Sequence, residues 1–98
     1  MPDFDHQKLD DIIHSRIRLA IMSILIGIDQ AEFTFLKEQV NTTDGNLSIH
    51  LKKLEEAKYI TVIKKFIKRK PVSIYRITQN GRIAFGKYVD QIEKFIKE

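Results

Sequence analysis

The stretch TTDGNLSIHLKKLEEAKYI, from Thr42 to Ile60, decides the fold. Leu47, Leu51 and Leu54 recur at helical spacing and define one buried face, and Thr43 can cap the first turn, so we predict an amphipathic helix over 43–57. A helix face turned to water is usually charged. Here the opposite face instead begins with small, neutral and apolar residues, namely Gly45, Asn46, Ser48 and Ile49.

The residues before this stretch predict two further helices. Ser15 is a suitable N-cap for RIRLAIMSILIGI, which is apolar nearly all round and ends at Gly27 and Asp29. Such a helix must be covered by a terminal helix of the same chain or by a second subunit. AEFTF indicates a short extended segment, and Thr34 can cap the brief helix FLKEQV. With the helix over 43–57, this predicts a helix-turn-helix.

The residues after the stretch predict a hairpin and a last helix. YITVIKKFIKRKPVSIYRIT is rich in β-branched and aromatic residues, which indicates antiparallel strands at about 60–67 and 72–78 around the basic tip KRKP. Pro71 belongs at the tip or at a strand edge. Thr78 can cap a helix over 79–97, and residues 4–13 favour a short N-terminal helix.

The order of these elements, α-α-β-α-α-β-β-α, is that of a winged helix. We therefore predict a mainly α fold with a small β-hairpin wing (α+β), in a single winged-helix domain over 1–98 with terminal helices at about 4–13 and 79–97.

Composition limits the possible functions. The chain has 98 residues and no cysteine, which excludes disulfides and thiolate metal sites and favours a reducing compartment. It contains no apolar run of the roughly 18 residues needed to span a membrane, and its N-terminus does not resemble a signal peptide. We expect a cytoplasmic protein that does not associate with membranes.

The charge is unevenly distributed. Residues 50–76 contain nine basic and two acidic residues, a charge of +7, whereas the rest of the chain carries −3. A concentrated basic surface is typical of a protein that binds a polyanion, although lysine-rich surfaces also occur simply for solvation.

The helix over 43–57 is suited to the major groove of duplex DNA. In helix-turn-helix proteins the first turns of the second helix contact base edges, where small, polar and apolar groups fit and acidic ones are repelled. The alternative to DNA contact is that Gly45 is only a turn residue and Ile49 an ordinary exposed side chain. The predicted DNA-binding residues of this helix are Thr43, Asp44, Gly45, Asn46, Ser48, Ile49, His50, Lys52 and Lys53.

The hairpin tip forms the second part of the predicted site. A wing of this charge would lie along the phosphate backbone or in the adjacent minor groove, although a basic strand edge can also serve to prevent aggregation. The predicted wing residues are Lys64, Lys65, Lys68, Arg69, Lys70 and Arg76.

The run TDGNLSIHLKKLEEAKYI resembles the recognition helix of the MarR-type and ArsR-type winged-helix regulators. The resemblance continues through IHSRIRLAIMSIL, FTFLKEQV and KRKPVSIYRITQNGRIAF, and covers about residues 9–90. It implies a transcriptional regulator that binds double-stranded DNA as a homodimer through its first and last helices. The predicted dimer residues are Leu9, Ile12, Ile13, Leu19, Met22, Ile26, Phe85, Tyr88, Val89, Ile92, Phe95 and Ile96.

Other classes of function have less support in the sequence. His6, Asp10 and His14 do not form a complete ligand set, so we predict no metal site and no cofactor. The chain is shorter than typical MarR-type proteins, which leaves a small-molecule effector open. No nucleophile–base pair or phosphate loop indicates an enzyme. The main alternative is a winged-helix module that binds proteins within a larger assembly.

Overall fold

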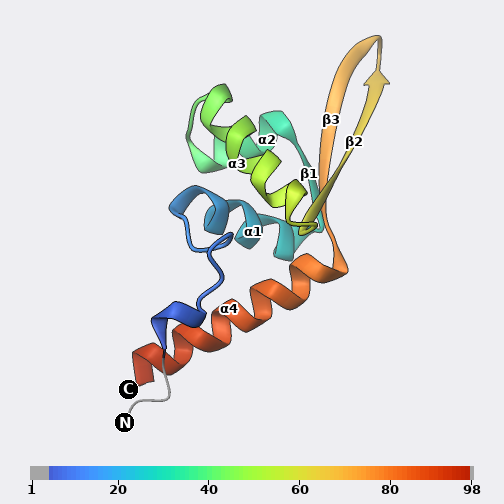
Figure 1. Ribbon diagram of the computed structural model, residues 1–98. Coiled ribbons are helices and arrows are strands. Elements are labelled where there is room, and N and C mark those ends of the chain that lie inside the picture. The colour runs from blue at the N-terminus through green and yellow to red at the C-terminus, as the bar shows by residue number, and fades with distance from the viewer. Residues whose placement is uncertain (1–4, 98) are drawn as a thin grey trace.

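The computed structural model describes residues 5–97. Its elements follow the order η1 (His6–Lys8), α1 (Arg16–Ile28), β1 (Gln30–Glu32), α2 (Phe33–Val40), α3 (Asp44–Glu56), β2 (Ile60–Ile67), β3 (Lys70–Ile77) and α4 (Gln79–Lys97). Helices α1, α2 and α3 form the body, the β2–β3 hairpin projects beyond it, and α4 extends away on the other side (Figure 1). This confirms the predicted α+β winged helix.

The core lies where the three helices of the body meet the base of the hairpin. Leu47, Leu51 and Leu54, the predicted inner face of α3, are all buried. They join buried side chains of α1, α2 and the strands, namely Ile21, Met22, Leu25, Leu36, Ile60 and Ile77. Each such side chain gains roughly 1.5–3 kcal/mol from leaving water. Burial of its inner face fixes the rotation of α3 and therefore the residues that it presents outward.

Side-chain caps set the starts of three helices, as predicted. The Ser15 and Thr43 side chains accept from the amides of Arg18 and Asn46, and Thr78 Oγ1 accepts from Gly81 N at 3.0 Å. Thr34 was expected to cap the next helix, and this is wrong. Helix α2 already begins at Phe33, after Glu32, because β1 ends there and the chain turns directly into the helix.

The prediction of an N-terminal helix over 4–13 is also wrong, because no such helix forms in the residues that the structure describes. Phe4 lies outside those residues. Only the single 3-10 turn η1 forms, and Leu9 is extended. Asp10 accounts for the break, because its side chain accepts from the amides of Ile12 at 2.8 Å and Ile13 at 3.0 Å. This local turn competes with helix formation, as aspartate often does.

The three strands form an antiparallel sheet of order β1-β3-β2. The predicted strand 60–67 is confirmed, whereas β3 begins two residues earlier than expected, at Lys70, and pairs with β2 from Ile67↔Lys70 to Ile60↔Ile77. Strand β1 pairs with β3 only along 74–76. The other edge of β3 is therefore unpaired at Pro71, as expected for a residue without an amide hydrogen.

Candidate nucleic-acid interface

The outward face of α3 carries the small and neutral side chains that the sequence predicted for it. Gly45, Asn46 and Ser48 are exposed in the first turns, and Ile49 is 56% exposed. Lys52 and Lys53 follow on the exposed surface one turn later. Since Leu47 and Leu51 hold the opposite face in the core, these residues form one continuous surface that ranges from neutral to basic along the helix.

An ion pair fixes the start of α3 against α2. Lys37 Nζ lies 2.8 Å from Asp44 Oδ1, and the two side chains are 44% and 71% exposed. Asp44 also lies in the first turn of α3, where the helix dipole favours a carboxylate. The predicted DNA contact Asp44 thus has a structural role as well, and Lys37 was missed, because nothing in the sequence pairs it with a residue seven positions away.

His50 occupies the flank of α3, where it is half-buried. Its Nδ1 accepts from Arg18 Nη1 of α1 at 2.8 Å. Burial lowers the pKa of His50 below its ordinary value of 6.5, and the neighbouring cations Arg18 and Lys53 lower it further. The ring is therefore held by its neighbours within the chain, and sequence reasoning missed Arg18 as the residue that orients it.

The wing ends in a two-residue turn made of Lys68 and Arg69. Both have positive φ values, 51° and 67°, which is the pattern of a type I′ hairpin turn. Such turns favour Asn-Gly, and a left-handed conformation costs roughly 1–2 kcal/mol for a residue with a Cβ. The chain thus retains two long basic side chains at the tip despite an unfavourable backbone conformation.

The other predicted wing residues divide into two groups. Lys64, Lys65 and Lys70 are exposed along the outer part of the hairpin, near the turn. Arg76 lies at the opposite end of β3, where its Nη2 donates to Gln30 Oε1 at 2.6 Å and its Nε lies 3.8 Å from Asp29 Oδ2. The structure therefore does not bring Arg76 to the tip.

The hairpin is attached to the body near its base. The Tyr75 ring packs against Phe33 of α2, with centroids 6.4 Å apart. Thr78 Oγ1 donates to Lys58 O at 2.6 Å, and Thr78 N donates to Tyr59 O at 3.0 Å. These contacts set the direction in which the hairpin leaves the body, so α3 and the wing are held in a defined relation.

The predicted dimer residues are not equally available to a partner. Ile13 and Met22 are fully buried within the single chain and Tyr88 is nearly so, so these three belong to the core. Val89 of α4 is half-buried, whereas Phe95 and Ile96 near its end are 59% and 74% exposed. The others pack, partly buried, against the core, namely Leu9, Ile12, Leu19, Ile26, Phe85 and Ile92. Segments of the chain itself thus cover much of the apolar surface of α1.

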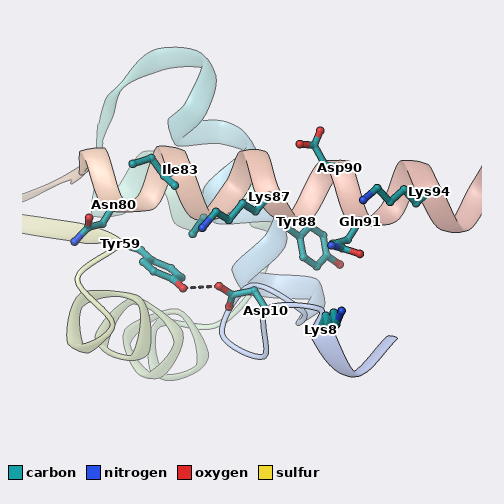
Figure 2. Close-up of a pocket in the computed structure, with 11 residues that line it drawn as sticks. Lys8, Asp10, Tyr59, Asn80, Ile83, Lys87, Tyr88, Asp90, Gln91 and Lys94 are labelled. Atoms are coloured by element: carbon teal, nitrogen blue, oxygen red, sulfur yellow. Dashed lines mark hydrogen bonds between the residues drawn. The ribbon is translucent and has the colours of Figure 1, made fainter. Parts of the chain in front are cut away.

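A groove of about 650 Å³ runs between α4 and the N-terminal segment. Figure 2 shows the Tyr59 hydroxyl, which donates to the Asp10 carboxylate across one end of it. Burial and this hydrogen bond raise the pKa of Tyr59 to about 12. Lys87 and Lys94 of α4 also line the groove, and Tyr88 is hydrogen-bonded to His14, with 2.8 Å between its OH and Nδ1.

Residues 5–97 contain no group of three or more side chains that could hold a metal ion. Of the candidates near the N-terminus, the Asp10 carboxylate accepts from Tyr59 and His14 is hydrogen-bonded to Tyr88. Among the described helices, none is long and apolar enough to cross a membrane.

Comparisons with known proteins agree with this architecture. An uncharacterized protein of Methanocaldococcus jannaschii is 43% identical over 86 residues, which is 88% of this chain and 94% of the relative. The structure of a transcriptional regulator homologue from Pyrococcus horikoshii OT3 superposes with a TM-score of 0.82 at 26% identity, covering 88% of this chain and 85% of that one. The protein ytfH of Salmonella typhimurium has the same fold, with a TM-score of 0.72 at 18% identity over 84% of this chain and 72% of its own.

The sequence profile of the winged helix DNA-binding domain matches residues 17–96. This range runs from the start of α1 to the end of α4 and includes α3 and the whole wing. The chain belongs to the winged helix DNA-binding domain family.

Proposed function

We propose that the protein is a transcriptional regulator that binds specific sequences in duplex DNA as a homodimer. The observation that carries the proposal is the pairing of two surfaces, the neutral outward face of α3 and the basic wing. The neutral face suits base edges in the major groove, where Asn46 and Ser48 can form hydrogen bonds and Ile49 can contact a thymine methyl group. The wing supplies the charge that binds phosphates.

The surroundings of this surface favour DNA over a protein partner. Residues 60–77 contain six basic residues and no acidic one. This is more charge than a strand edge needs to prevent aggregation. The likeness to a transcriptional regulator homologue at 26% identity and to the MarR-type and ArsR-type pattern of α3 points in the same direction.

The dimer part of the proposal rests on α4. Ile96 is 74% exposed near the end of this helix, and the partly buried Val89 and Ile92 lie on the same side of it at helical spacing. An exposed apolar patch of this kind can mark an interaction surface. A two-fold dimer would bind a roughly palindromic site with half-sites about 10 base pairs apart or a multiple of that. We leave Ile13, Met22 and Tyr88 out of the proposed interface, because all three lie in the core of one chain.

Selection of bound sequences from random duplex DNA tests the function. We expect a palindromic consensus, together with an affinity that falls steeply with salt. Failure to retain any duplex at low salt, combined with salt-insensitive capture of a protein partner, would instead support the protein-binding module.

Sedimentation of an Ile96→Glu variant tests the dimer. We expect this change to dissociate it, whereas Ile28→Glu, at a site 50% exposed at the end of α1, serves as the matched control and should leave it intact. A wild-type protein that sediments as a monomer would refute the dimer and leave the DNA-binding proposal to the selection experiment.

A further inference from the structure

The exposed position of Phe66 in the wing is explained neither by the basic charge of the wing nor by packing in the core. Its side chain is 76% exposed, in a strand that ends at the next residue. Large aromatic side chains normally leave water by packing in a core or an interface. Phe66 does neither within the described chain, so its position requires a separate explanation.

The strand register gives Phe66 an apolar neighbour. Phe66 pairs with Pro71 across the hairpin, and directly paired residues of antiparallel strands project to the same face. The two-residue turn of Lys68 and Arg69 lies immediately beyond them. Phe66 and Pro71 together therefore form an apolar pair, here called the tip pair, at the end of the hairpin.

The tip pair lies on the face of the hairpin that is turned toward the helices. Side chains alternate along a strand, and Ile60, on the same face of β2 as Phe66, is buried in the core. The hairpin continues well past α2 and α3 (Figure 1), so the outer end of this face has no helix to cover it. It is therefore open to solvent, in agreement with the 76% exposure of Phe66.

Basic residues surround the tip pair. Lys64 precedes Phe66 on the same face, Lys65 lies next to it in the strand, and Lys68, Arg69 and Lys70 follow. All five are exposed. An apolar side chain surrounded by cations is complementary to an apolar surface flanked by anions. Stacked bases between two phosphate backbones in a nucleic acid form such a surface.

We propose that Phe66, supported by Pro71, inserts between two base pairs from the minor groove and kinks the DNA to which the protein binds. This inference rests on the proposed function. Architectural proteins use phenylalanine and proline wedges in this way, and the resulting bend brings more backbone against the protein. Here the bend brings flanking phosphates toward Lys64, Lys68 and Arg69. Pyrimidine–purine steps, which unstack most readily, are the preferred insertion points.

The experiment uses the full-length protein and duplexes of about 30 base pairs with central TA and CA steps. Dyes at the two ends report the bend by energy transfer, and 2-aminopurine placed at successive positions reports unstacking. We expect the wild type to shorten the end-to-end distance and to raise 2-aminopurine fluorescence at one step. Phe66→Ala should abolish both signals and lower affinity by about tenfold. The salt dependence of binding should also become weaker, because without the bend the flanking phosphates are no longer brought toward Lys64, Lys68 and Arg69.

Two variants make the test specific. Ile67→Ala removes a neighbouring exposed apolar side chain, 39% exposed, from the opposite face, and should leave the bend unchanged. Phe66→Leu retains an apolar wedge and should retain part of it. Because Phe66 is exposed, Phe66→Ala is expected to fold, which circular dichroism verifies.

The outcomes separate this inference from the proposed function. If Phe66→Ala bends and unstacks the DNA as the wild type does, the wedge is refuted and DNA binding stands. If Phe66→Ala changes the sedimentation of the protein but not the bend, Phe66 is a protein contact and the wedge is again refuted. If the wild type binds none of these duplexes even at low salt, the wedge is refuted, and the selection of bound sequences decides whether the proposed function stands.

Discussion

Arg18 of α1 connects His50 of α3 to the N-terminal segment. Its Nη1 donates to His50 Nδ1 at 2.8 Å and its Nε donates to Ile12 O at 2.5 Å. A guanidinium group can only donate, so His50 must accept at Nδ1 and is neutral in this arrangement. Protonation of the ring would remove the acceptor and place a second positive charge beside Arg18.

This contact predicts that stability falls in mild acid. The pKa of His50 is lowered in the folded chain, so below about 6.5 the unfolded chain binds more protons than the folded one. The free energy of unfolding is therefore lost as pH falls from that value toward the lower pKa of the folded chain. We expect His50→Gln, which keeps an acceptor but does not titrate, to reduce this slope in urea melts between pH 7 and 5 (roughly the histidine range). His6→Gln, at an exposed site, is the control. An equal effect of both variants would disprove the assignment of the loss of stability in acid to His50.

Ile49→Glu is expected to abolish specific DNA binding. Ile49 is 56% exposed on the outward face of α3, so the change should not disturb the core, but it places a carboxylate against the negative potential of the groove. Gel shifts at fixed salt measure the effect, and Ile49→Ala, which removes the methyl contact without adding charge, should weaken binding less. Unchanged affinity in the glutamate variant would rule out this face of α3 as the recognition surface.

Loss of the two tip charges should weaken specific and non-specific binding alike. If Lys68 and Arg69 each neutralise one phosphate, the double alanine variant should lower the slope of log affinity against log salt by about 1.8. Lys87→Ala with Lys94→Ala removes the same charge from α4 and is expected to leave the slope unchanged. Equal slopes in the tip variant and the wild type would mean that the tip does not contact DNA.

Replacement of the tip by Lys68→Asn and Arg69→Gly should separate stability from function. Both positions have positive φ, and Asn-Gly is the favoured pair for this turn, so we expect the free energy of unfolding to rise by about 1–2 kcal/mol. DNA affinity should fall as in the alanine variant. Urea melts and gel shifts on the same preparations compare the two quantities; a destabilised variant would contradict the type I′ conformation of the turn.

Two glycines of α4 should respond in opposite ways to alanine. A Cβ on Gly81 would lie 2.2 Å from Tyr59 O, a backbone atom that cannot move aside easily, so Gly81→Ala should destabilise the fold by about 1–3 kcal/mol or more. A Cβ on Gly86 would meet nothing within 4 Å, so Gly86→Ala should stabilise the helix by about 0.5–1 kcal/mol. Thermal melts at one protein concentration measure both, and a tolerated Gly81→Ala would show that the start of α4 is not held closely against Tyr59.

Much of the fold follows from local patterns in the sequence. The spacing of Leu47, Leu51 and Leu54, the caps Ser15, Thr43 and Thr78, and the alternation around the hairpin gave correct positions for α1, α3, the wing and α4. These signals come from residues that are close together in the sequence, so they can be recognised without the tertiary structure. The outward residues of α3 follow directly, because the helix has only one apolar face to bury.

The errors occurred where local patterns compete or where distant segments meet. Apolar spacing before residue 14 favoured a helix, but the Asp10 side chain bonds two following amides and forms a turn instead. Ile13 and Met22 resembled interface residues, yet the folded chain buries both. The Arg76 charge was counted with the wing, although its contacts with Gln30 and Asp29 hold it at the base of the sheet.

The sequence by itself determined the winged-helix order, the inner and outer faces of α3 and the concentration of basic charge around the hairpin, because these depend on periodicity and composition. Only the tertiary structure decided that Arg18 holds His50, that the tip turn places Lys68 and Arg69 in left-handed conformations, and that Phe66 stands exposed opposite Pro71. Those relations depend on strand register and on contacts between residues far apart in the chain, which no local pattern encodes.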